Sequence, residues 1–67
     1  MYRNLKAEMA RQDLSICALA ELIHMSMQKL SRRLKGEVPF TVDEAIDIRE
    51  KMKLQHMPIE VLFKRED

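Results

Sequence analysis

The side chains best suited to chemistry in this sequence are those that pair with phosphate groups and base edges, and they gather in one short segment. Residues 22–36 contain four basic residues and no acidic residue, whereas residues 41–67 contain seven acidic and five basic residues. A formal net charge of only +1 therefore conceals a basic segment followed by a mildly acidic one. Such a segment can bind nucleic acid, and a solvated helix face is the alternative interpretation. The basic residues of this segment are Lys29, Arg32, Arg33 and Lys35.

Two short helices joined by a tight turn are predicted to position these side chains. Ser15 and Ser26 are good N-caps, because a serine hydroxyl can accept a hydrogen bond from an amide in the first turn of a helix. We therefore predict helices over residues 16–23 and 27–35. Together with their caps, the two helices occupy residues 15–36.

The residues around the predicted turn are those that close packing of two helices requires. Ala20 is small enough to let the helices approach, and Ile23 and Met25 supply an apolar contact on each side of the turn. Leu30 packs the second helix onto the first. Gly36 stands where a helix commonly ends in the left-handed backbone conformation.

The outward side of the helix predicted over residues 27–35 carries the candidate binding residues. Gln28 can pair with an adenine edge, an arginine with a guanine edge, and Met27 can touch a thymine methyl group. The lysines and Arg33 suit backbone phosphates, which position a protein without specifying sequence. Whether Arg32 or Arg33 contacts bases stays open at this point. The candidate DNA-binding residues are Ser26, Met27, Gln28, Lys29, Ser31, Arg32, Arg33 and Lys35.

The rest of the chain also predicts helices, which makes the fold class all-α with five short helices. A first helix ends at about residue 12. A capping box at Thr41 and Glu44 opens a fourth helix that runs to about residue 53, and a fifth covers residues 58–63. The fourth helix is predicted to turn Val42, Ala45, Ile48 and Met52 inward. The predicted core comprises Leu5, Met9, Leu19, Ala20, Ile23, Met25, Leu30, Leu34, Phe40, Ala45, Ile48, Met52, Leu54, Leu62 and Phe63.

Length and composition restrict the class of protein. A chain of 67 residues forms one small domain with a limited core. Its single cysteine cannot form an intramolecular disulfide and fits a reducing compartment. The longest apolar run, residues 16–20, is far shorter than the ~20 residues that span a bilayer. No signal-peptide pattern is visible, so we expect a cytoplasmic protein without a membrane partner.

Catalytic, metal and cofactor sites are not expected. The spacing of Cys17, His24 and His56 matches no zinc pattern. The sequence has no phosphate-binding loop, nucleophile elbow or convincing pair of catalytic carboxylates. We therefore predict neither an enzyme nor a cofactor, a metal or a small-molecule ligand.

The segment also resembles a known family, the Cro/repressor-type (XRE-like) helix-turn-helix proteins. The likeness spans about residues 3–63, and the stretches RRLKGEVPFTVDEAIDI and PIEVLF resemble a subgroup of small phage or prophage regulators. Three positions depart from the family pattern. Ile16 stands where glutamine is common, His24 where glycine is common, and Arg33 where an apolar residue is usual. The matching residues are Leu14-Ser15, Leu19-Ala20, Ser26, Leu30 and Gly36.

The resemblance implies one lambda-repressor-like helix-turn-helix domain over residues 1–67. It implies a double-stranded DNA-binding transcriptional regulator, a phage Cro-like repressor, that inserts the helix at 27–35 into the major groove of an operator. A protein-binding adaptor, an anti-repressor and an antitoxin with the same fold are the alternatives. A homodimer is one use for the surplus apolar residues, and completion of the core is the other. These surplus residues are Ile46, Ile59, Val61 and Phe63.

Overall fold

The computed structural model describes residues 2–65 of the predicted 1–67 domain, and these residues form five helices and no strand. The all-helical prediction is therefore confirmed, and each predicted boundary lies within two residues of the observed one. Among the described residues, no helix combines the length and apolar character needed to cross a lipid bilayer. The helices are α1 (Arg3–Arg11), α2 (Ile16–Leu22), α3 (Met27–Leu34), α4 (Val42–Lys51) and α5 (Ile59–Leu62).

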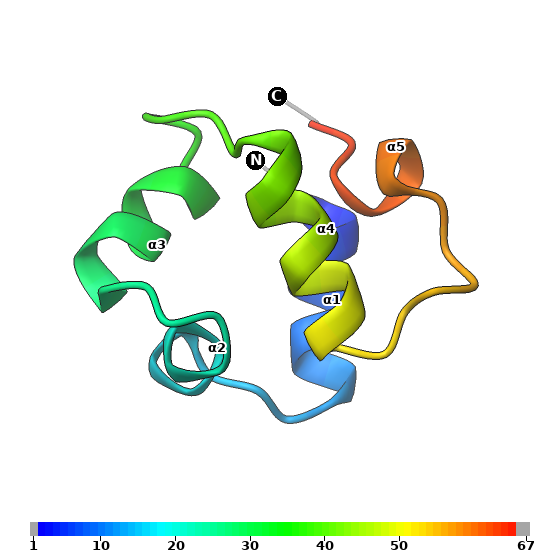
Figure 1. Ribbon diagram of the computed structural model, residues 1–67, viewed down its shortest axis with the longest axis horizontal. Coiled ribbons are helices and arrows are strands. Elements are labelled where there is room, and N and C mark those ends of the chain that lie inside the picture. The colour runs from blue at the N-terminus through cyan, green and yellow to red at the C-terminus, as the bar shows by residue number, and fades with distance from the viewer. Residues whose placement is uncertain (1, 66–67) are drawn as a thin grey trace.

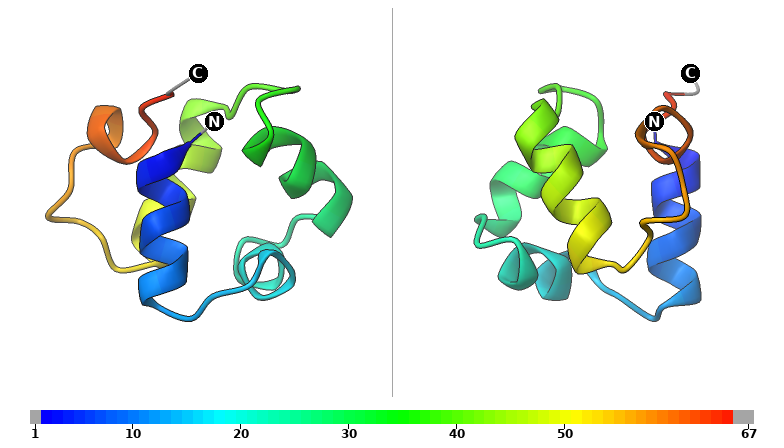
Figure 2. Two further views of the ribbon diagram at one scale, coloured as in Figure 1. Left: turned by 180° about the vertical axis from the view of Figure 1, so that it is seen from behind. Right: turned by 45° about the vertical axis from the view of Figure 1, so that its right-hand side comes forward.

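The helices are arranged so that one side of α3 faces away from the rest of the molecule. α2 packs against α3, while α5 packs against both α1 and α4. In Figure 1 the α2–α3 pair lies on one side of α4 and α5 lies on the other. The two further views in Figure 2 keep this order. The α2–α3 pair therefore forms an edge of the molecule.

Every helix contributes one fully buried aliphatic side chain to a common core. Burial of each such side chain stabilises the fold by about 1.5–3 kcal/mol relative to leaving it exposed. Side chains at the ends of α1 also bond to the neighbouring helices. Asn4 Nδ2 donates to the Val61 carbonyl at 2.7 Å, and Gln12 Nε2 donates to the Met52 carbonyl at 3.0 Å. The five fully buried side chains are Leu5, Leu19, Leu30, Ile48 and Leu62.

Val42 is the clear error in the predicted inward face of α4, since this residue is 72% exposed. The other three residues of the predicted inward face of α4 are buried. At 3.6 residues per turn, Val42 points about 85° away from the mean direction of those three residues. Four residues of the predicted core are only partly buried, although they pack against the core: Ile23, Met25, Phe40 and Phe63.

All three aromatic side chains of the sequence meet in one cluster. Tyr2, which is missing from the predicted core, is only 4% exposed. Its ring centroid lies 5.1 Å from that of Phe40 and 6.1 Å from that of Phe63, and those two lie 5.1 Å apart. All three contacts are edge-to-face, an arrangement that suits the ring quadrupoles. The cluster joins the segments before α1, before α4 and after α5.

Four of the helices in the described region end at a residue with a left-handed backbone, and only one of these residues is glycine. The bonding is alike at each end. After α4, the Lys53 amide donates to the Glu50 carbonyl at 3.0 Å and the Leu54 amide to the Arg49 carbonyl at 2.9 Å. This pair of bonds closes the last turn in a Schellman motif. The left-handed residues are Asp13, His24, Gly36 and Lys53, with φ angles of 54°, 56°, 86° and 58°.

Replacing Lys53 with glycine is expected to raise the free energy of unfolding by about 0.5–1 kcal/mol. A residue with a Cβ atom in the left-handed conformation costs about 1–2 kcal/mol, and the larger entropy loss of glycine offsets about 0.5–1 kcal/mol of this gain. The thermal midpoint should rise by about 4–8 °C for each kcal/mol. Lys53→Ala is the control, because it removes the charge but keeps Cβ. An equal rise in both variants would contradict backbone strain as the cause.

Candidate nucleic-acid interface

The backbone around α3 follows from three local features of the sequence. The Ser26 hydroxyl accepts a hydrogen bond from the Lys29 amide at 3.2 Å, which caps the start of the helix as predicted. Leu30 and Leu34, four residues apart, are buried on one face. Gly36 ends the helix in the left-handed conformation, also as predicted. Because the two leucines turn inward, the opposite face of α3 points to solvent.

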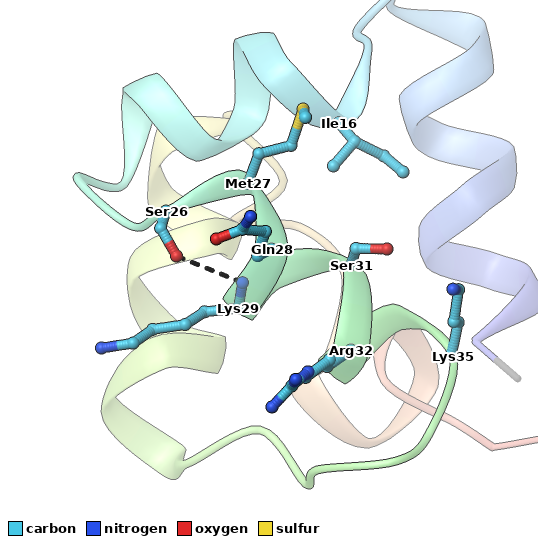
Figure 3. Close-up of a pocket in the computed structure, with 8 residues that line it drawn as sticks. All are labelled: Ile16, Ser26, Met27, Gln28, Lys29, Ser31, Arg32 and Lys35. Atoms are coloured by element: carbon cyan, nitrogen blue, oxygen red, sulfur yellow. Dashed lines mark hydrogen bonds between the residues drawn. The ribbon is translucent and has the colours of Figure 1, made fainter.

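The exposed face of α3 borders a hollow, which we call the α3 hollow (Figure 3). Seven of the eight predicted contact residues line it, together with one residue from the start of α2. Within the described part of the chain, its lining includes three cations and no acidic residue. The α3 hollow is therefore a concave surface of one charge sign. Its lining residues are Ile16, Ser26, Met27, Gln28, Lys29, Ser31, Arg32 and Lys35.

The long polar side chains of the α3 hollow are available for a ligand. Gln28, Arg32 and Lys35 are all exposed. Their side chains make no hydrogen bond or ion pair with any of residues 2–65. No internal bond has to break before these groups bind a phosphate or a base edge.

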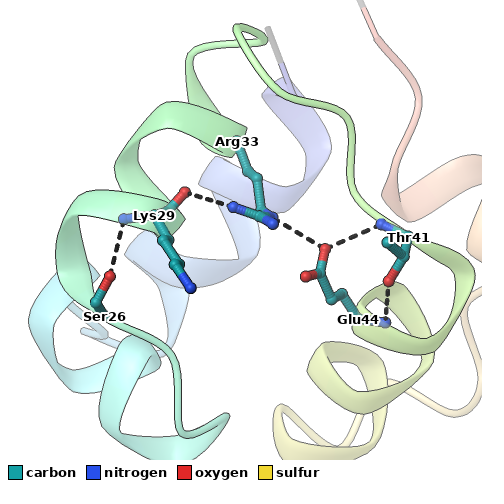
Figure 4. Close-up of polar contacts among 5 residues, drawn as sticks. All are labelled: Ser26, Lys29, Arg33, Thr41 and Glu44. Atoms are coloured by element: carbon teal, nitrogen blue, oxygen red, sulfur yellow. Dashed lines mark hydrogen bonds and ion pairs between the residues drawn. The ribbon is translucent and has the colours of Figure 1, made fainter.

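Arg33, the eighth predicted residue, lies apart from the α3 hollow (Figure 4). Its Nε donates to Glu44 Oε1 at 3.0 Å, and its Nη1 donates to the Lys29 carbonyl at 3.2 Å. Only 16% of its side chain is exposed. The structure thus separates the two arginines that the sequence left as alternatives, since Arg32 lines the hollow and Arg33 connects α3 to α4.

Glu44 has two roles in this connection, only one of which the sequence predicts. The predicted capping box is confirmed, because the Glu44 amide donates to Thr41 Oγ1 at 3.1 Å and the Thr41 amide donates to Glu44 Oε1 at 2.9 Å. The same Oε1 atom also accepts the bond from Arg33. Glu44 therefore joins the start of α4 to the last turn of α3.

The hydrogen bonds and the charge around the Glu44 carboxyl group change its pKa. Burial raises the pKa of Glu44, but the hydrogen bond from the Thr41 amide and the hydrogen bond and charge of Arg33 lower it by more. The net result is a pKa below the ordinary value of 4.5. The carboxylate is therefore ionised in the folded protein at neutral pH.

The lowered pKa predicts a contribution to stability that is lost in acid. This contribution is complete above the ordinary pKa of 4.5 and disappears as the pH falls through the lower pKa of the folded protein. Glu44→Gln keeps an acceptor for the cap but removes the charge, so it should lower the free energy of unfolding by about 1 kcal/mol at neutral pH. Urea denaturation should show this difference shrinking toward pH ~3.

Glu50→Gln provides the control for this pH dependence. Glu50 is exposed and also on α4, and its side chain has no partner among residues 2–65. Its replacement should change stability little at any pH. A Glu44→Gln difference that stayed constant from neutral to acid pH would contradict the charge-based account.

The described residues also define what lies outside the α3 hollow. Within this part of the chain, no three or more His, Cys, Asp or Glu side chains are placed to hold a metal ion. Cys17 is exposed and is not bonded in a disulfide. Among residues 2–65, the α3 hollow combines concavity, positive charge and side chains without internal partners.

Comparisons with known proteins do not place the chain in a family. Models of protein families, curated proteins and solved structures give no significant match. The functional argument therefore depends on the residues of this chain and on the geometry around α3.

Proposed function

We propose that the protein is a sequence-specific regulator that binds double-stranded DNA by inserting α3 into the major groove of an operator. The observation that carries this proposal is the composition of the α3 hollow. Its described lining contains three cations, together with serine and glutamine side chains that can form hydrogen bonds, and no acidic residue. The width of the B-DNA major groove admits an α-helix. Positive charge without acids attracts the phosphate backbone that borders that groove.

The side chains of the α3 hollow divide into two groups by chemistry. Gln28 and Arg32 suit adenine and guanine edges, so they give sequence specificity. Lys29 and Lys35 suit phosphates, so they give affinity and orientation. The capped N-terminus of α3 at Ser26 adds a positive dipole end to the same surface. Both kinds of contact that a specific duplex complex needs are thus present.

The packing of α2 against α3 supports a helix-turn-helix of the Cro/repressor type. α2 packs against α3, and both Ala20 on α2 and Leu30 on α3 are buried. The Met25 amide donates to the Ala20 carbonyl at 2.9 Å, which closes the end of α2 before the turn. We propose that this pair of helices acts in the manner of a small phage repressor, with α2 beside the DNA backbone.

Selection from random duplexes tests the proposal. Purified protein should enrich duplexes with a common motif, and a palindromic motif would show that two copies bind with recognition helices ~34 Å apart. Recovery of duplexes without any common motif would contradict sequence-specific binding. The same experiment identifies the DNA sequence of the operator, which the amino-acid sequence does not specify.

A second candidate is a protein-binding adaptor, an anti-repressor or an antitoxin that uses the same surface. The observation that favours it is apolar lining in the α3 hollow, from Ile16 and Met27. The affinity for a protein partner bound through these residues would depend little on salt concentration, whereas the affinity for DNA falls steeply as the salt concentration rises. A salt titration with each ligand therefore distinguishes the two functions.

A further inference from the structure

The α3 hollow differs in character from one end to the other. Ile16 is the first residue of α2 and Met27 is the first residue of α3, and both line the hollow. Figure 3 shows the thioether of Met27 and the branched side chain of Ile16 at the end of the hollow near the two helix starts. Arg32 and Lys35 lie toward the other end of α3. The end near the two helix starts therefore carries the apolar lining, although Lys29 is also in the first turn of α3, and the other end is cationic.

The apolar end cannot make the polar contacts that are usual for a surface that binds DNA. Neither a thioether nor an isoleucine side chain can neutralise a phosphate or donate a hydrogen bond to a base edge. Met27 is nevertheless 53% exposed, so its apolar surface is open to a ligand. This apolar surface can bury an apolar group of the ligand and so remove that group from water.

Duplex DNA presents one such group in its major groove, the C5-methyl group of thymine. The remaining lining of the α3 hollow, with Gln28 and Lys29 next in the chain, matches the acceptors and phosphates that surround that methyl group. This charge complementarity indicates DNA as the occupant in preference to an apolar peptide. A residue at the start of α3 is also where recognition helices commonly contact base edges.

We infer that Ile16 and Met27 together receive a thymine methyl group and so specify thymine at one position of the bound sequence. This inference rests on the proposed function and goes further by assigning a base to a pair of residues on two helices. Met27 supplies the contact surface. Ile16, which is partly buried and packed against the core, supplies a second side of the site.

Substitution of thymine by deoxyuridine tests the inference, because it deletes only the methyl group and keeps base pairing and backbone charge. In the duplex obtained by selection, each thymine is replaced in turn and the dissociation constant is measured. At one position of each half-site, the loss should weaken binding of the wild-type protein about fourfold, the value for one buried methyl group. The Met27→Ala variant should bind the thymine and deoxyuridine duplexes equally.

Val42→Ala is the matched control, since Val42 is a more exposed apolar residue that does not line the α3 hollow. This variant should keep the full fourfold discrimination of the wild-type protein. Ile16→Ala should reduce the discrimination once circular dichroism shows that the variant is folded. Equal binding of thymine and deoxyuridine at every position would overturn the inference while leaving the proposed function intact. Absence of a preferred duplex in the selection would overturn both.

Discussion

Replacing Arg32 with alanine should weaken binding to the selected duplex about 5- to 150-fold, equivalent to about 1–3 kcal/mol. Arg32 is exposed in the α3 hollow and has no internal partner among residues 2–65. Its removal should therefore delete the proposed base contact without breaking a bond that holds the fold. The free energy of unfolding should change by less than about 0.5 kcal/mol. Titration with the duplex and urea denaturation of the same preparation measure the two quantities.

Arg33→Ala is the matched control and should show the opposite pattern. Its guanidinium bonds to Glu44 and to the Lys29 carbonyl, so its loss should lower the free energy of unfolding by about 1–3 kcal/mol. The folded variant should bind the duplex almost as tightly as the wild-type protein. If Arg33→Ala lost affinity at unchanged stability while Arg32→Ala kept its affinity, the orientation of α3 described above would be wrong.

Replacing Leu30 with alanine should have the largest effect on stability of the changes considered. Leu30 is fully buried and, together with the buried Leu34, packs α3 into the common core. Replacing a buried leucine with alanine lowers the free energy of unfolding by about 2–5 kcal/mol. A chain of 67 residues has a total stability of about 3–10 kcal/mol, so the loss removes a large share of it. Urea denaturation at neutral pH measures the loss.

The control for this prediction lies on the other side of the same helix. Met27→Ala removes a large apolar side chain that is already half exposed, so stability should change by no more than about 0.5 kcal/mol. If Leu30→Ala and Met27→Ala lowered the free energy of unfolding by similar amounts, the two faces of α3 would not differ in burial. Near-wild-type stability of Leu30→Ala would contradict the position of α3 in the core.

The helices and their caps could be predicted because their causes are local. Ser15, Ser26 and Thr41 each accept a bond from an amide three residues ahead, a distance that a short window of sequence contains. The buried faces of the helices follow from periodicity in the same way. Where periodicity was applied too loosely, at Val42, the predicted burial was wrong.

The contacts that tie the helices together could not be predicted, because they join residues with no regular spacing. Arg33 and Glu44 are eleven residues apart and lie on different helices. Tyr2 and Phe63 meet from opposite ends of the described chain. The left-handed residue Lys53 is of a type that seldom ends a helix in this way. Each of these features depends on the final packing of the five helices.

The three departures from the resembled family pattern each have a structural counterpart. His24 adopts the left-handed conformation in which glycine would be easiest, with φ of 56°. Arg33 bonds to Glu44 in place of an apolar contact. Ile16 lines the α3 hollow beside Met27. The residues that depart from the pattern thus take part in the end of α2, in the connection of α3 to α4 and in the α3 hollow.

The dependence of duplex affinity on salt tests the central proposal most directly. With Lys29 and Lys35 of the α3 hollow on phosphates, a plot of log affinity against log salt should have a slope of about −2 per protomer. That slope corresponds to a loss of affinity of about 15-fold between 50 and 200 mM salt. Lys35→Ala should reduce the magnitude of the slope by about 1. A slope near zero for the wild-type protein, unchanged by Lys35→Ala, would contradict DNA binding by α3.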